Sequence, residues 1–465
     1  MNRRMWMPWG WMVVVWVVWN LWLPPVAVAK ESDKVRRFVT ANGIQVFLIE
    51  NHVNPMIEMR LLVAGGGSHD PAGREGVAAL TAWMFNEGGG ELDSVAFQER
   101  LHYYGIALAA NAGQDTLEIS MTTLSEHLDE AWSRLGDAML RPRFSSADFE
   151  RGIHERVADL IKSEEEPSFQ AMRALNPMIY GDHPYARPVN GTLESVKRIE
   201  LDDIRRHHTA AFRAPGMVIA VAGDVDLERL KGLVEKHLSG LESKPGPFKS
   251  PVEARVGAKG GQKHIEMDLP QTTVKMGVVA IHREDPDFYA LTVMNQILGG
   301  SGFTSRLTRV LREERGLTYG VYSYFSPLMG RGPLLISTQT KNESAEEAIK
   351  LIRNELTRML DEDVSADELR DIQRYLTGSF PLQLDGLDKL ADTWCRIGFY
   401  RRGLDYLDLW PERIRAVTHE DVRRVAWRFL VLERMHTVTV GKRQSGVAAR
   451  DDGTPPKTGS SPPSR

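Results

Sequence analysis

Arg312 and Tyr319 carry side chains that could stabilise a developing negative charge. They lie seven positions apart, in a run that opens with Ser305-Arg306-Leu307 and closes with Gly316-Leu317-Thr318-Tyr319. A guanidinium group is a permanent cation of fixed geometry, and a phenol is a compact neutral hydrogen-bond donor. An isolated pair at this spacing is typical of a surface arginine and a core tyrosine, so the surrounding sequence must decide between the two readings.

Side chains that could bind a metal ion are not grouped by spacing. The thirteen histidines are scattered. His207 and His208 are adjacent, so they point to different sides of a helix, and we expect a solvated surface there. Asp159 and the run Glu164–Glu166 offer carboxylates, but such a run is typical of a solvated helix face, and without nearby imidazoles its zinc affinity would be poor. A metal site rebuilt from these carboxylates is therefore disfavoured.

Composition places the chain among ordinary globular proteins. It has 465 residues, of which 42% are hydrophobic and 26% charged, with a net charge of −4 and a pI of about 6.4. This balance does not suggest a nucleic-acid partner. The single cysteine, Cys395, excludes an internal disulfide and a cysteine-rich metal site, and its apolar context predicts a small core residue.

The two ends of the chain are expected to lie outside the folded part. Arg3 and Arg4 precede an apolar run that ends before Ala27-Val28-Ala29. This layout predicts a signal peptide over residues 1–29 and export, with a bacterial periplasm as the expected location. An uncleaved anchor in the inner membrane is the alternative, since the apolar run is long. Residues 442–465 are rich in Pro, Ser, Gly and charge, which predicts a disordered tail.

Internal similarity indicates a duplicated chain. The tripeptide at Ser146 recurs at Ser365, the run at Asp203 recurs at Asp421, and the helix opening at Asp129 recurs at Glu346. All three matches occur in the same order at nearly one offset, between 217 and 219 residues.

Each half reads as a mixture of strands and helices. Asn42-Gly43 predicts a hairpin, and the alternating Ile57, Met59, Leu61 and Val63 predict a strand with one buried face. Apolar residues at helical spacing predict amphipathic helices near 128–139 and 349–360. We therefore predict an α+β fold of two homologous domains, residues 30–242 and 264–441, joined by a linker at 243–263 that is rich in Gly, Pro and Lys.

The run Gly76–Trp83 resembles the active-site helix of the pitrilysin/insulinase family of zinc peptidases, which includes proteins like the mitochondrial processing peptidase. Members of the family carry His-x-x-Glu-His on this helix. This chain has Ala79 and Trp83 at the histidine positions and Ala82 at the glutamate position. The family's third ligand, a glutamate about 75 residues further on, corresponds to Asp159. Zinc requires nitrogen, sulfur or carboxylate ligands. The resemblance therefore implies a degenerate site with no cofactor in this chain.

The resemblance covers roughly residues 35–441 and implies an architecture. In the family, two homologous domains, each an antiparallel-rich sheet packed with helices, form half of a clamshell. Two such halves close around a peptide-sized chamber. Further matching elements are His183-Pro184-Tyr185 and Gly223-Asp224.

The resemblance also implies a role for Arg312 and Tyr319, which occupy the positions of a family arginine and tyrosine that project toward the zinc site. The implied role is to bind peptide carbonyl groups and to steady the oxyanion. Loss of the zinc ligands with retention of this pair resembles the non-catalytic subunit of heterodimeric members. The expected partners are a homologous zinc subunit bearing His-x-x-Glu-His and a peptide substrate. A pseudoenzyme acting as a scaffold or peptide-binding module without a peptidase partner is the alternative.

Overall fold

The computed structural model describes residues 30–443, apart from positions 250, 252, 255, 256, 258 and 301–303. The predicted signal peptide and most of the predicted tail lie outside the described residues. So do Ser301 and Gly302, which precede the Arg312/Tyr319 segment. Within the described ranges, no helix combines the length and the hydropathy needed to cross a bilayer.

The first sheet has six strands in the order β1-β2-β6-β3-β5-β4. Their bounds are β1 Val35–Val39, β2 Gln45–Glu50, β3 Met56–Ala64, β4 Ala107–Ala112, β5 Thr116–Leu124 and β6 Val218–Gly223. Only β2 and β6 pair in parallel among these neighbours. The predicted hairpin joins β1 to β2, with Gly43 at a φ of 104°, where glycine is favoured over residues with a Cβ. The alternating residues Ile57, Met59, Leu61 and Val63 are all buried, as predicted.

The second sheet has five strands in the order β7-β11-β8-β10-β9. Their bounds are β7 Gln262–Glu266, β8 Gln271–Val279, β9 Val321–Phe325, β10 Pro333–Lys341 and β11 His436–Gly441. Here β11 and β7 pair in parallel and the other neighbours are antiparallel. Because β7 begins at Gln262, the last two residues of the predicted linker belong to a strand.

Helices surround both sheets. Those before the linker are η1 Glu31–Lys34, η2 Gly67–His69, α2 Val77–Met84, α3 Ser94–Tyr103, η3 Ser125–His127, α4 Leu128–Leu140, α5 Ser146–Glu164, α6 Pro167–Tyr180, η4 Pro184–Ala186, α7 Leu193–Val196, α8 Leu201–Ala211 and α9 Leu227–Leu238. Those after it are α10 Phe288–Leu298, α11 Arg306–Thr308, η5 Arg309–Glu314, η6 Asn342–Ser344, α12 Ala345–Asp361, α13 Ala366–Ser379, η7 Phe380–Gln383, α14 Leu387–Phe399, α15 Tyr406–Arg415, α16 His419–Phe429 and η8 Leu432–Arg434.

Residues at matching positions of the two halves cap matching helices. The carboxylate of Asp203 accepts a hydrogen bond from the backbone N–H of Glu200 at the start of α8, and Asp421 does the same for Thr418 at the start of α16. The serine pairing predicted from the sequence is wrong by one position. Ser145 caps α5 and Ser365 caps α13, so the equivalent of Ser365 is Ser145 rather than Ser146. The N-cap hydroxyl decides the alignment because it accepts the backbone N–H of the third helical residue.

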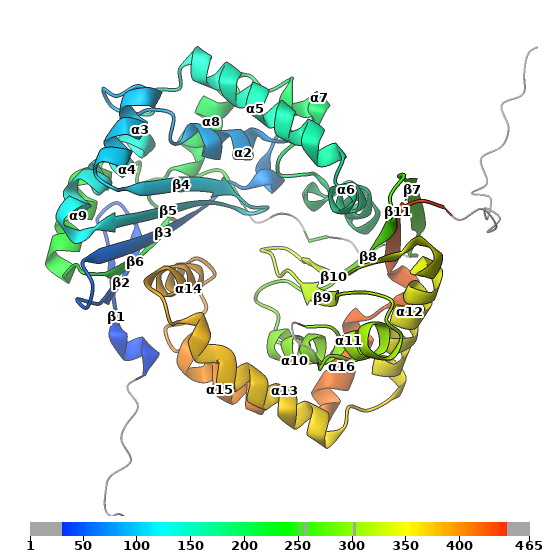
Figure 1. Ribbon diagram of the computed structural model, residues 1–465. Helices are drawn as coiled ribbons and strands as arrows, with labels where there is room; N and C mark the ends of the chain where they lie inside the picture. Colours follow the sequence, from blue (N-terminus) through cyan, green and yellow to red (C-terminus); the bar gives the residue numbers. More distant parts are fainter. Residues whose placement is uncertain are drawn as a thin grey trace, which may run out of the picture.

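One long helix from each half packs on the sheet of the other half. Helix α14 lies on β3 and β6 of the first sheet, and α6 lies on β8 and β11 of the second (Figure 1). Apolar residues of the first sheet, among them Phe47, Leu62 and Val218, therefore join the core built by the second half. The predicted linker separates the two sheets along the chain, but it does not separate the helices that cover them.

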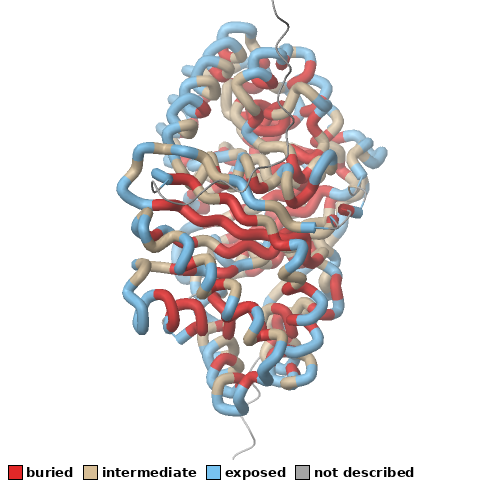
Figure 2. Tube along the Cα trace, turned by 90° about the vertical axis from the view of Figure 1, so that its right-hand side faces the viewer, coloured by how far each residue is buried: buried red, intermediate tan, exposed pale blue. Residues whose placement is uncertain are grey.

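The α+β fold with two related units is confirmed by these two sheets and their helices. Buried stretches follow the strands and the helix faces that turn toward them, while the outer helix faces are exposed (Figure 2). Cys395 lies on α14 and is fully buried, with its thiol 3.3 Å from the carbonyl oxygen of Val218. It is a core residue, as predicted, and burial raises the pKa of its thiol.

Candidate functional site

Helix α2 carries the degenerate site and begins at a buried carboxylate. Asp70 accepts hydrogen bonds from the backbone N–H groups of Gly76 and Ala78, at 2.7 and 2.9 Å. This carboxylate caps the first turn, where the helix has unsatisfied donors. Burial raises the pKa of Asp70 to about 7. Ala79 and Ala82 lie on this helix and are 5% and 6% exposed, so they form part of its packed surface.

Trp83 fills the space at the end of α2 that faces α5. A Cβ atom built on Gly152 would lie 2.7 Å from the Trp83 ring, so the indole occupies the room that glycine leaves. The indole N–H donates to Glu155 at 3.2 Å, and the guanidinium of Arg151 lies 5.2 Å from the centre of the ring. Trp83 is therefore fixed by packing, a hydrogen bond and a cation–π contact.

Asp159 lies one turn beyond the point where Trp83 meets α5. It follows Glu155 by four residues, so both lie on one face of the helix, and its side chain is exposed. Burial lowers the pKa of the Arg156 guanidinium, and the negative charge of Asp159 acts in the opposite direction. The structure thus places all four degenerate positions, Ala79, Ala82, Trp83 and Asp159, on two helices in contact, α2 and α5.

The donor set at these positions does not fit zinc. Two methyl groups and an indole N–H provide no ligand atom, and one carboxylate cannot replace three ligands. Over the described ranges, no group of three or more His, Cys, Asp or Glu side chains is arranged to hold a metal ion. Metal-assisted hydrolysis cannot be built from this helix pair.

The expectation that His207 and His208 form a solvated surface is wrong. Both are buried, at 6% and 4% exposure. The His208 imidazole lies 3.1 Å from the carbonyl oxygen of Ala138, and the ring of Phe248 covers His207 at 5.2 Å. Burial lowers the pKa of His207 to about 3 and that of His208 to about 4. Neighbouring residues did not indicate the burial of His207, because Phe248 comes from the distant linker.

Arg312 and Tyr319 lie in the second half, at a distorted helix end. Arg312 belongs to η5, a stretch of π-helix that continues α11, and such stretches are frequent at functional sites. The carboxylate of Glu368 anchors the start of α11 by accepting two hydrogen bonds from the buried Arg306, at 2.9 and 2.7 Å. Beyond η5, the chain turns at Gly316, with a φ of 61°, and presents Tyr319 at 89% exposure.

The structure does not bring Arg312 and Tyr319 to the degenerate site of the same chain. Helices α2 and α11 lie on opposite sides of the molecule, in the upper left and the lower right of Figure 1. The Tyr319 phenol is exposed, so it is accessible to another molecule that approaches the second half.

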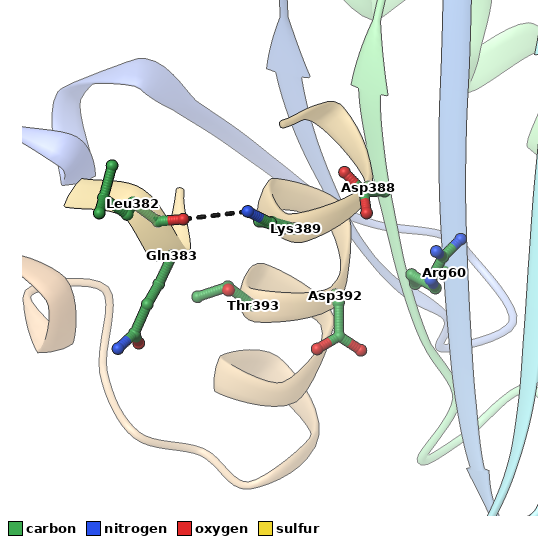
Figure 3. Close-up of a pocket in the computed structure, with 7 residues that line it drawn as sticks. All are labelled: Arg60, Leu382, Gln383, Asp388, Lys389, Asp392 and Thr393. Atoms are coloured by element: carbon green, nitrogen blue, oxygen red, sulfur yellow. Dashed lines mark hydrogen bonds between the residues drawn. The ribbon is translucent and has the colours of Figure 1, made fainter. Parts of the chain in front are cut away.

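A charged cavity of about 530 Å³ lies where α14 meets the first sheet. Figure 3 shows its lining residues, which come from β3, η7 and α14. They are Arg60, Leu382, Gln383, Asp388, Lys389, Asp392 and Thr393. Lys389 donates to the carbonyl oxygen of Leu382 at 3.0 Å and to Asp385 at 2.6 Å. The cavity contains both signs of charge and lies between a helix of the second half and a strand of the first.

Known families match most of this chain. The model for insulinase (peptidase family M16) matches residues 45–193, and the model for the peptidase M16 inactive domain matches residues 198–376. The crystal structure of a peptidase M16 inactive domain from Pseudomonas fluorescens is 30% identical. It superposes with a TM-score of 0.84, over 88% of this chain and 98% of that one. The chain belongs to the insulinase family, M16.

Curated relatives agree with this assignment. A protein of Helicobacter pylori named as a non-peptidase homolog is 28% identical over 75% of this chain and 81% of its own length. An uncharacterized zinc protease of Streptomyces coelicolor is also 28% identical, over 78% of this chain and 76% of its own. With Ala79, Ala82 and Trp83 in place of the zinc-site residues, this chain is a non-peptidase M16 homologue.

Proposed function

We propose that this chain is the zinc-free subunit of an exported heterodimeric metallopeptidase. It would pair with a homologous subunit that carries His-x-x-Glu-His and zinc, and it would complete the chamber around an unfolded peptide. The observation that carries this proposal is the exposure of Tyr319 in the second half, whereas α2 belongs to the first half. A hydrogen-bond donor so placed is accessible to another chain, which supports a role in a partner's site.

The chemistry of the pair suits that role. The phenol of Tyr319 would donate a hydrogen bond to the oxyanion that forms at the cleaved bond in the partner, and Arg312 would bind a peptide carbonyl group. Preorganised donors of this kind stabilise the transition state more than the ground state, so they increase turnover. The π-helix at η5 and the turn at Gly316 set the position of both side chains.

A scaffold or peptide-binding role without any peptidase partner is the second candidate. The packing of Trp83 favours this scaffold role. Its ring lies over Gly152 and its indole N–H donates to Glu155, so α2 is stabilised as a structural helix. An exported location is part of the main proposal and rests on the sequence of residues 1–29. A retained membrane anchor is the alternative.

The test is purification of the tagged full chain from its native host, followed by identification of whatever co-purifies. A His-x-x-Glu-His homologue recovered in a one-to-one ratio supports the heterodimer. Recovery of the chain alone or as a homodimer supports the scaffold instead.

Tyr319→Phe tests the role of the hydroxyl in the recovered complex. Assembly should be unchanged, and turnover should fall by a factor of about 10². Tyr103→Phe is the matched control, since Tyr103 is 80% exposed on α3 of the first half and should have no effect. Equal turnover of the Tyr319→Phe complex and the wild type would eliminate the oxyanion role.

A further inference from the structure

An arginine of α5 lies on the helix face that meets the degenerate site. Arg156 follows Gly152 by four residues, so the two residues share one face of α5. Gly152 lies under the Trp83 ring, which marks where this face meets the end of α2. Ala79 precedes Trp83 by one turn on α2, as Arg156 follows Gly152 by one turn on α5. The next turns of the two helices therefore carry Ala79 and Arg156.

The reach of the Arg156 side chain agrees with this position. Its Nη1 donates to the Oδ1 atom of Asn190 at 3.3 Å. The carbonyl oxygen of Asn190 lies 3.3 Å from a Cβ atom built on Gly76, which is the N-cap of α2. Arg156 therefore extends from the turn after Gly152 toward the start of α2. Ala79 lies on α2 between these two points.

No close contact neutralises the charge of Arg156. Across the ranges that the structure describes, no carboxylate lies within ion-pair distance of it, and its buried Nε has no hydrogen-bond partner. Asp159, one turn further along α5, attracts it only from a greater distance. Arg151 of the same helix differs, because it pairs with Glu87 and, at 2.9 Å, with Asp148. Since a guanidinium group stays protonated at any ordinary pH, the degenerate site keeps a permanent positive charge.

We propose that the guanidinium of Arg156 replaces the metal ion as the fixed cation of the degenerate site and excludes divalent metal ions from it. Loss of the ligands at positions 79 and 83 and gain of this charge are then two parts of one change. A cation repels Zn²⁺ strongly at short distance in a partly buried site. Restoring the ligands alone would therefore not restore metal binding. This inference concerns the first half only and does not depend on a peptidase partner.

The test restores two histidines in the purified full chain. Ala79→His with Trp83→His, called here the two-histidine chain, offers Asp159 as the third ligand. Competition with a chromophoric chelator measures its affinity for zinc. Adding Arg156→Gln, which keeps a hydrogen-bonding group and removes the charge, should increase that affinity by at least about a hundredfold. Equal affinities with and without Arg156→Gln, or no zinc binding by either chain, would overturn the proposal.

Two controls separate charge from space. Arg156→Lys in the two-histidine chain keeps the positive charge, so it should give no gain in zinc affinity. Arg415→Gln removes an exposed charge from α15 in the second half and should also give none. If Arg156→Lys increases the affinity as much as Arg156→Gln does, the bulk of the side chain and not its charge keeps zinc out, and the proposal is wrong.

A second measurement keeps Trp83 and its packing on Gly152, so it does not require the two-histidine chain to fold. Ala79→His alone introduces one imidazole beside Arg156. A neighbouring cation disfavours the protonated imidazole, so its pKa, followed by NMR, should rise by about 1 when Arg156→Gln is added. An unchanged pKa would show that Arg156 does not lie at position 79 and would refute the proposal.

Discussion

Replacing Gly152 with alanine tests whether Trp83 is a structural substitute at the degenerate site. Gly152 lies in the interior of α5, where alanine is preferred over glycine by about 1 kcal/mol. In isolation, the substitution should therefore stabilise the helix. In this fold, however, the new methyl group would lie 2.7 and 2.8 Å from two carbon atoms of the Trp83 ring.

These distances are well inside the normal separation of carbon atoms, about 3.5–4.0 Å. Relieving such an overlap typically costs about 1–3 kcal/mol. Gly152→Ala should therefore lower the free energy of unfolding by up to about 2 kcal/mol in the wild-type chain, once the helix gain is included. In a chain that carries Trp83→Ala, the overlap is absent. There, Gly152→Ala should raise the free energy of unfolding by about 1 kcal/mol.

The quantity to measure is the effect of Gly152→Ala on the free energy of unfolding, which should change sign when Trp83 is replaced. Urea denaturation of the wild type, the two single variants and the double variant gives the coupling free energy directly. We expect a coupling of about 1–3 kcal/mol, the size of the overlap alone. If Gly152→Ala has the same effect with and without Trp83, the indole does not occupy the space over Gly152, and the account of the degenerate site fails.

Three further predictions concern stability and metal content. His207 has a pKa of about 3 when folded, below 6.5 when unfolded, so stability is lost as pH falls below 6.5. Between about pH 7.5 and about pH 5, this residue should remove about 2 kcal/mol from the free energy of unfolding. His207→Leu should abolish this loss of stability at low pH. His102→Leu, at an exposed site, should leave it unchanged. If the stability of His207→Leu depends on pH as that of the wild type does, buried His207 is not its source. Asp115 accepts hydrogen bonds from the Tyr185 hydroxyl and from the N–H of Met329 in the second half, at 2.6 and 2.8 Å. Asp115→Ala should therefore destabilise the fold by about 3 kcal/mol in urea denaturation, and a loss below 1 kcal/mol would show that this contact between the halves is dispensable. Mass spectrometry of the purified chain should find no stoichiometric zinc, and one zinc per chain would refute the degenerate site.

Local structure was predictable where the physical signal is local. The alternation of Ile57, Met59, Leu61 and Val63 could only be a strand with one buried face, and Asn42-Gly43 could only turn tightly. The degenerate helix was also recognisable, because the residues that replace the zinc ligands stand at fixed positions. These features depend on neighbours within a few residues along the chain.

Features that depend on distant contacts were not predictable. The apolar stripe of α14 predicts a helix, but it does not say which sheet the helix covers. His207 looks like a surface residue until Phe248 is placed over it, and His208 until Phe144 is placed against it.

The exchange of α6 and α14 affects how this chain can be made. The first sheet is complete once residue 223 has been synthesised, yet the helix that shields Phe47, Leu62 and Val218 ends only at Phe399. During synthesis, more than a hundred further residues must be added before that apolar surface can be covered. Separate expression of the first half would leave it exposed permanently. Each sheet therefore depends on a helix from the other half for part of its cover.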